Sequence, residues 1–127
     1  MRGETRKLEQ QARAFQRILN SALGRLPNYI GDVQRGINLQ AEEFRKAELM
    51  YAVGRMVTEK AFTSTTTDTG FRGNVKFYIE SRTGVDVSAA SEQGHEVEVL
   101  FRSGTRFRVV KNEKRGETML ITMTEVI

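Results

Sequence analysis

The chain has 127 residues, of which 20 are basic and 16 acidic, giving a formal net charge of +4. This length suits one domain that buries roughly two-thirds of its unfolded surface, so a core can form without disulfides. Because there is no cysteine and the single histidine is His95, the sequence excludes disulfides, thiolate chemistry and multi-histidine metal sites. The mild basic excess suits an anionic ligand such as a nucleotide, but no run of basic residues indicates nucleic-acid binding. No segment is long and apolar enough to be a membrane span or the core of a signal peptide.

The first half of the chain predicts two helices separated by a short strand. Apolar residues recur at helical spacing from about residue 5 to residue 23, and Gly24 then ends the first helix. Residues 32–37 follow as a short strand that places Arg35 on the same side as two apolar residues. A second helix is predicted from about residue 39 to residue 53.

The second half of the chain predicts strands. Residues 57–68 are rich in threonine and β-branched residues, and residues 74–81 alternate cleanly between polar and apolar side chains. Three further strands are expected between residues 96 and 126, joined by tight turns into an antiparallel meander. The predicted fold class is therefore α+β, with N-terminal helices followed by a mostly antiparallel sheet in a single domain over residues 1–127. The start at Met1 suits either a natural N-terminus or the boundary of a piece cut from a longer protein.

Two glutamates, Glu96 and Glu98, precede an apolar run in the first strand of this meander. If Ser103-Gly104 is a two-residue hairpin loop, Glu98 faces Val109 and Glu96 faces Lys111 on the more apolar side of the hairpin. A carboxylate in that position is destabilising by several kcal/mol unless it is paired, hydrogen-bonded or beside a cleft. The alternative is a salt bridge between Glu96 and Lys111, with Glu98 at the solvated end of the sheet.

Two other segments carry groups that suit an anionic ligand and a carboxylate. Arg35 can present its guanidinium fork to phosphates, and Gly36 after it allows a ligand to approach the backbone closely. The hydroxyl residues of segment 62–67 can hold a carboxylate by hydrogen bonds, although such residues also commonly decorate a sheet surface. Each of these two segments is a weak indication when it is taken alone.

Taken together and in this order, the three segments resemble the mono-ADP-ribosyltransferase toxin family, in its arginine–serine–glutamate class. The matching residues are Gln34-Arg35-Gly36 on the first core strand, Phe62-Thr63 followed by Ser64-Thr65-Thr66 on the second, and Glu96-Val97-Glu98 on a late strand. The likeness runs from about residue 29 to residue 111, and it includes the continuation VLFRSGTRFRV after the glutamates. The chain departs from the family pattern at Thr66, where a second serine is usual, and in having less helix before the arginine strand.

The resemblance implies that the substrate is NAD, which is split at the bond between nicotinamide and ribose without a metal ion. Glu98 would stabilise the positive charge that grows on the ribose, as carboxylates do in glycoside hydrolysis. Ser64 would hydrogen-bond Glu98, and Arg35 would bind the diphosphate. Glu96 would attract an acceptor arginine of a target protein and take its proton.

The resemblance also implies further contacts with NAD and with the target. The expected NAD-binding residues are Arg35, Gly36, Ser64, Thr65, Phe71, Arg72 and Glu98. Phe71 would pack on nicotinamide and Arg72 would bind phosphate, although a plain surface loop is an equal alternative for both. The segment from Val87 to His95 would recognise the target protein.

On this resemblance, the predicted function is NAD-dependent mono-ADP-ribosylation of a protein arginine by a secreted or injected bacterial effector that acts in the cytoplasm of the target cell. The expected partners are NAD, a target protein and an immunity protein that neutralises the toxin, and neither nucleic acid nor a membrane is expected. Two alternatives stay open at this point: a non-catalytic, basic nucleic-acid-binding module, and an NAD glycohydrolase that uses water as its acceptor.

Overall fold

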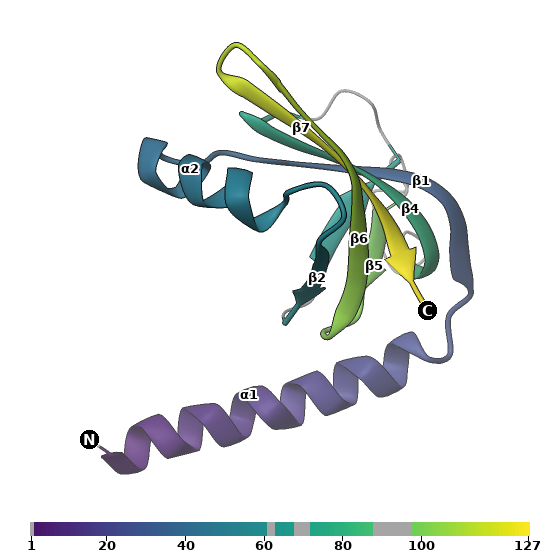
Figure 1. Cartoon of the computed structure of the whole chain (residues 1–127). Helices are drawn as coiled ribbons and strands as arrows, with labels where there is room; N and C mark the ends of the chain where they lie inside the picture. The colour runs from purple at the N-terminus through teal and green to yellow at the C-terminus, as the bar shows by residue number, and fades with distance from the viewer. Residues whose placement is uncertain (1, 61–62, 68–71, 88–97) are drawn as a thin grey trace.

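The computed structural model of the chain describes residues 2–60, 63–67, 72–87 and 98–127, and these ranges hold two helices and seven strands (Figure 1). In chain order the elements are α1 (Arg2–Leu23), β1 (Asn28–Ile37), α2 (Ala41–Met50), β2 (Met56–Glu59), β3 (Thr63–Thr66), β4 (Val75–Asp86), β5 (Glu98–Phe101), β6 (Thr105–Arg115) and β7 (Thr118–Val126). The predicted α+β class is confirmed, because the helices lie in the N-terminal part of the chain and the strands form one mostly antiparallel sheet.

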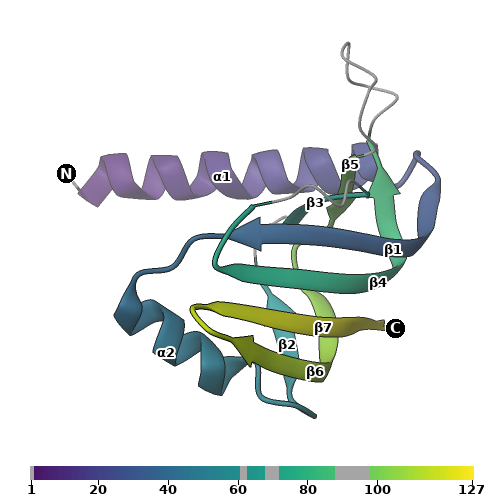
Figure 2. The same cartoon turned by 90° about the horizontal axis from the view of Figure 1, so that it is seen from above.

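The seven strands hydrogen-bond in the order β1-β3-β5-β4-β7-β6-β2, and β1 also pairs with β4. β4 and β7 run parallel, whereas β1 with β4 and β6 with β7 form long antiparallel ladders. Figure 2 shows these four long strands side by side, with β2 running across their direction. α2 lies beside the hairpin of β6 and β7, where Glu48 forms an ion pair with Lys114 at 3.0 Å (Figure 2).

The apolar core forms because the strands keep a period of two. β7 alternates between buried and half-buried side chains along its whole length, and Met119, Ile121 and Met123 point inward. Phe101 of β5 and Phe107 of β6 meet edge to face, with their ring centroids 5.0 Å apart. The core also contains Val33, Val57, Val75, Phe77, Ile79, Val99 and Val109 from the strands, and Phe44 and Ala47 from α2.

The hairpin predicted around Ser103-Gly104 is wrong. The chain does turn there, but β5 pairs with β3 and β4, while β6 pairs with β2 and β7. The Gly104 N–H donates to the carbonyl of Glu59 at 2.6 Å, and this bond directs β6 along β2 rather than back along β5. Glu98 therefore does not face Val109; it lies on the exposed side of β5.

Other element boundaries also differ from those predicted. Segment 57–68 forms two strands, β2 and β3, because they join different parts of the sheet: β2 lies at its edge against β6, and β3 lies between β1 and β5. β4 continues to Asp86, well past its predicted end at residue 81. The second helix spans 10 residues, which is shorter than the predicted range 39–53.

α1 runs as a long, separate helix along one side of the domain, with its C-terminal end nearest the sheet (Figures 1 and 2). Leu23 at that end is buried, whereas the side chain of Ile18 is 68% exposed. Among the α1 residues whose burial is described, Leu23 at the C-terminal end is the one that is buried. In the described part of the chain, neither helix has the length and apolar character that crossing a membrane requires.

Candidate active site

The centre of the candidate site is a hydrogen bond between two exposed side chains on neighbouring strands. β3 and β5 pair antiparallel, which places Thr66 opposite Glu98 and Ser64 diagonal to it on the same face. Ser64 Oγ donates to Glu98 Oε1 at 2.9 Å, the contact that the sequence predicted. The hydroxyl donor restricts the rotamer of the carboxylate, so Glu98 is presented to solvent in a defined position.

The strand that carries Ser64 is tied to β5 by its next residue. Thr65 points to the opposite side of β3, is 4% exposed, and donates from Oγ1 to the carbonyl of Val99 at 2.7 Å. This buried bond fixes β3 and β5 relative to each other one residue away from Glu98. The NAD contact expected for Thr65 stays a prediction.

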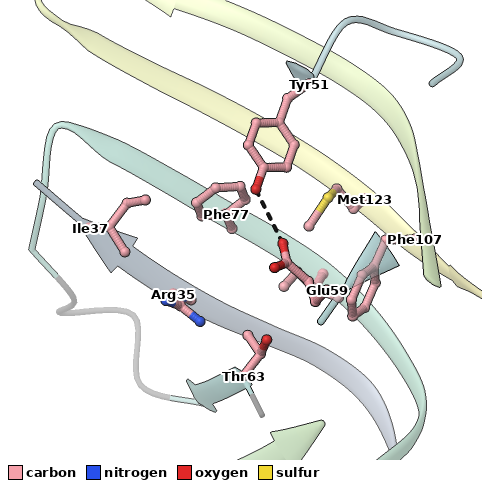
Figure 3. A pocket seen from close by; sticks show the side chains of 9 residues that line it. Arg35, Ile37, Tyr51, Glu59, Thr63, Phe77, Phe107 and Met123 are labelled. Atoms are coloured by element: carbon pink, nitrogen blue, oxygen red, sulfur yellow. Dashed lines mark hydrogen bonds between the residues drawn. The ribbon is translucent and has the colours of Figure 1, made fainter. Parts of the chain in front are cut away.

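Arg35 lines a pocket on the core-facing side of β1, where it shares a face with Val33 and Ile37. The pocket spans about 380 Å³, counting space that is open to solvent. It is lined by Arg35, Ile37, Tyr51, Glu59, Thr63, Phe77, Ile79, Phe107 and Met123 (Figure 3). Its lining combines a guanidinium, a carboxylate and a phenol with a mostly apolar wall. No ion pair joins Arg35 to a carboxylate within the described ranges.

The pocket and the Ser64–Glu98 pair are neighbours across β3. Thr63 lines the pocket and the next residue, Ser64, points to the other side of the same strand. Among the described residues, β1 and β3 pair at one position, Gln34 with Thr66. Among the contacts recorded for the described residues, none joins Arg35 directly to Glu98.

Tyr51 and Glu59 form a polar pair inside the pocket that the sequence did not reveal. The Tyr51 hydroxyl donates to Glu59 Oε1 at 3.2 Å, and both side chains point into the pocket beside Arg35 (Figure 3). Burial and the neighbouring Glu59 carboxylate raise the pKa of Tyr51 well above its ordinary value, and the Arg35 guanidinium offsets part of this rise. The strand alternation that buries Val57 also turns Glu59 inward. This alternation is the sequence pattern that could have identified Glu59 as a pocket residue.

Arg72 lies next to the end of β1. Its neighbour Gly73 has a φ of 143°, and a Cβ atom there would lie 2.5 Å from the carbonyl oxygen of Ile37. Only glycine allows this close approach, so the backbone at Gly73 is held against the C-terminal end of the strand that carries Arg35 and Gly36. The Arg72 side chain is exposed, and its predicted phosphate contact stays a prediction.

Several predicted residues cannot be placed. Phe71, Glu96 and the segment 88–95 lie outside the described residues. The expected alternative partner of Glu96, Lys111, forms an ion pair with Glu113 at 3.5 Å. Within the part of the chain that the structure describes, no group of three or more histidine, aspartate or glutamate residues could hold a metal ion.

The fold and this arrangement of residues correspond to a known family. A sequence model described as "NAD:arginine ADP-ribosyltransferase" matches residues 4–126. The chain belongs to the NAD:arginine ADP-ribosyltransferase family. This match covers nearly the whole chain and leaves the nucleic-acid-binding alternative without support.

Individual family members agree with the assignment. The putative NAD(+)–arginine ADP-ribosyltransferase Mav of Mycobacterium avium is 44% identical over 117 residues, which cover 87% of this chain and 14% of Mav. The NAD(+)–protein-arginine ADP-ribosyltransferase Tre1 of Pseudomonas putida is 38% identical over 130 residues, covering 99% of this chain and 25% of Tre1. The chain thus spans a quarter or less of the length of these two relatives.

One solved relative matches in three dimensions as well. The Vis toxin, an ADP-ribosyltransferase from Vibrio splendidus, superposes with a TM-score of 0.72 at 28% identity, covering 93% of this chain and 58% of that chain. Vis has also been solved in complex with agmatine. At this identity the likeness supports both the fold and the family.

The raised pKa of Tyr51 predicts a loss of stability in alkali. Because folding favours the protonated phenol, the folded state retains its proton above pH ~10 while the unfolded state releases it. The free energy of unfolding should therefore fall above pH ~10, by up to about 1.4 kcal/mol per pH unit more steeply than in Tyr51→Phe. Urea unfolding of both proteins between pH 8 and about 11.5 measures this difference.

A second variant separates the causes of this shift. Glu59→Gln keeps an acceptor oxygen for the Tyr51 hydroxyl but removes the negative charge that opposes its ionisation, so its alkaline slope should lie between those of wild type and Tyr51→Phe. Equal alkaline slopes in wild type and Tyr51→Phe would show that Tyr51 ionises as readily in the folded state as in the unfolded state.

Proposed function

We propose that the chain is a single catalytic domain that transfers ADP-ribose from NAD to an arginine side chain of a target protein and releases nicotinamide. The observation that carries this proposal is the 2.9 Å hydrogen bond from Ser64 to Glu98. The bond holds an exposed, oriented carboxylate across β3 from the pocket that contains Arg35, on a domain of the NAD:arginine ADP-ribosyltransferase family.

Glu98 is the group that stabilises the reacting ribose. When the bond from ribose C1′ to the nicotinamide nitrogen breaks, its electron pair leaves with neutral nicotinamide and positive charge develops on the ribose. A fixed carboxylate at that position lowers the energy of this oxocarbenium-like state. Ser64 holds the carboxylate in place, so little reorganisation is needed as the charge develops.

Arg35 and its surroundings supply the binding energy for NAD. A guanidinium fork matches two oxygens of a diphosphate, and Arg72 beside the end of β1 adds a second positive charge. The apolar wall of the pocket, with Phe77 and Phe107, suits a flat heteroaromatic ring. In this proposal Gly36 lets the backbone approach the nicotinamide amide, and Phe71 packs on its ring.

The proposed acceptor is a guanidinium group. Agmatine, the compound solved in complex with the related Vis, carries the same guanidinium as an arginine side chain. A guanidinium becomes a nucleophile when it loses a proton, and Glu96 is the proposed base that takes it. The new bond joins a guanidinium nitrogen to ribose C1′, and the proton passes to the Glu96 carboxylate.

The biological setting follows from the same relationship. Vis is a toxin, and we propose that this domain belongs to a secreted or injected effector that acts in the cytoplasm of a target cell. The segment from Val87 to His95 is the proposed contact with the target protein, and an immunity protein is the proposed antagonist. The proposed reaction uses no metal ion, so nicotinamide release should continue in excess chelator.

Replacement of the pocket arginine should weaken NAD binding. Arg35→Ala removes a charge-assisted contact with the diphosphate worth about 1.5 to 3 kcal/mol, so the dissociation constant for NAD should rise at least about tenfold. Isothermal titration calorimetry of the folded variant measures this change. Arg106→Ala, at an exposed arginine of β6, is the matched control and should bind NAD like wild type. An unchanged affinity in Arg35→Ala would remove Arg35 from the site.

The two glutamates should have separable roles. Glu98→Gln should abolish both nicotinamide release and transfer to protein, because a neutral amide cannot stabilise the developing cation. Glu96→Gln should lose transfer to arginine but keep much of the slower hydrolysis of NAD by water, since water needs no such base to approach the ribose. Labelled NAD with a cell lysate measures transfer, and nicotinamide release measures total turnover.

Glu117→Gln in the turn between β6 and β7 is the control, because this glutamate is exposed and neither of these strands pairs with β3 or β5. It should retain both activities. Equal loss of both activities in Glu96→Gln would contradict the separate roles of the two glutamates. Full activity in Glu98→Gln would contradict the proposed function itself.

A further inference from the structure

Glu125 is a buried carboxylate that the proposed mechanism does not use. It follows Met119, Ile121 and Met123 at the inward positions of β7, pairs across the sheet with Phe107, and is 5% exposed. A charged group at such a position is strongly destabilising unless hydrogen bonds compensate for its lost hydration. The contacts of Glu125 show what compensates.

The carboxylate accepts its hydrogen bonds from two consecutive residues of β4. Oε1 accepts the backbone N–H groups of Arg82 and Thr83, each at 2.9 Å, and Oε2 accepts the Thr83 hydroxyl. These are charge-assisted bonds to a buried acceptor, which makes them strong and geometrically restrictive. Glu125 is therefore a cross-link between β7 and one point of β4.

That point is a β-bulge. Along the ladder of β1 and β4, Tyr29 pairs with Gly84 and Gly31 pairs with Ser81, so one residue of β1 opposes the two residues Arg82 and Thr83 of β4. The parallel pairing of β4 with β7 also ends just before it, at Glu80. A bulge bends its strand and leaves backbone donors without ladder partners, and here the Glu125 side chain accepts those donors.

The bend directs the end of β4 onto the strand of the candidate site. Beyond the bulge, Val85 and Asp86 pair with Leu100 and Val99 of β5. The Val87 N–H donates to the carbonyl of Glu98 itself at 2.9 Å. The end of β4 therefore holds one side of β5 at Glu98, and the bulge sets the direction of this end of β4.

Tight packing transmits the position of this segment to β5. A Cβ atom on Gly84 would lie 2.6 Å from Cγ1 of Val99 and 3.0 Å from Cε1 of Phe101, so the backbone of β4 touches the inward side chains of β5. The buried Ser81 adds a bond from its hydroxyl to the carbonyl of Tyr29 at 2.8 Å, which fixes the other side of the bulge. A shift of the bulge must therefore displace β5 or open this packing.

We propose that Glu125 is a positioning residue for Glu98, because it holds the bulge that places β5. This inference rests on the proposed function for its effect on turnover, but the effect on β5 itself does not depend on any activity. Glu125 touches neither NAD nor the acceptor in this proposal. It acts through Arg82, Thr83 and the end of β4.

Two substitutions of Glu125 separate hydrogen bonding from charge. Glu125→Gln keeps an oxygen that can accept both backbone N–H groups, and its amide can donate to the Thr83 hydroxyl, so the bulge should persist. Glu125→Met has a similar length but lacks the oxygen acceptors. Glu117→Met, the same change at an exposed glutamate in the turn between β6 and β7, is the matched control.

The first readout is hydrogen exchange of the Val87 amide in the absence of NAD. In Glu125→Met this amide should exchange at least about tenfold faster than in wild type, because its bond to Glu98 opens more often.

The second readout is nicotinamide release well below the unfolding temperature. Its kcat should fall by about 10- to 100-fold in Glu125→Met while KM for NAD changes little, because Arg35 lies on β1 outside the bulge. Glu125→Gln and Glu117→Met should resemble wild type in both readouts.

Unchanged Val87 exchange or unchanged kcat in folded Glu125→Met would overturn the proposal. A fall in kcat in Glu125→Gln as large as that in Glu125→Met would also overturn it. If Glu125→Met does not fold, Thr83→Val is the deciding variant, because it removes the hydroxyl that donates to Glu125. It should still speed exchange of the Val87 amide and lower kcat. Exchange and kcat equal to those of wild type would overturn the proposal. Absence of nicotinamide release from wild type would instead contradict the proposed function, and Val87 exchange would still decide whether Glu125 holds β5.

Discussion

The candidate site depends on the placement of β5, a strand of 4 residues held between β3 and β4. Val99 and Phe101 of this strand are fully buried, so strand alternation turns Glu98 toward solvent. The antiparallel pairing with β3 then brings Ser64 to within 2.9 Å of the Glu98 carboxylate. Because core packing, strand pairing and the hydrogen bond all act on one short strand, a displacement of β5 would disturb each of them.

Three carboxylates of the domain show how burial and hydrogen bonding are matched. Glu98 is exposed and accepts from the Ser64 hydroxyl, which leaves it open to a ligand. Glu59 is half-buried in the pocket and accepts from Tyr51. Glu125 is buried and accepts from two backbone N–H groups and a hydroxyl. Among the described residues, the buried Glu125 has three donors, whereas Glu98 and Glu59 have one each, as the loss of hydration on burial requires. Of the three, only the exposed Glu98 suits direct contact with a reacting ribose.

The sequence predicted the fold class, the antiparallel pairing of β6 with β7 and the contact between Ser64 and Glu98, because these follow from local patterns and from a family motif. It placed the turn of that hairpin around residues 112–116, whereas β6 continues to Arg115. It did not predict the partners of β5. A turn at Ser103-Gly104 is a local signal, whereas the pairing of β5 is decided by the burial of Phe101 against Phe107 and by distant β3 and β4. Glu125 was missed for a related reason: its donors are backbone groups of a bulge, and no side-chain pattern marks a bulge in advance.

The most direct measurement of the central claim is mass spectrometry of agmatine after incubation with the protein and NAD. If the site transfers ADP-ribose to a guanidinium, the spectrum should contain agmatine with one added ADP-ribose, together with at least an equal amount of released nicotinamide. Nicotinamide release with unmodified agmatine would show that water is the acceptor and would contradict transfer to arginine. Bound NAD with neither product would contradict the assignment of Glu98 as the group that stabilises the reacting ribose.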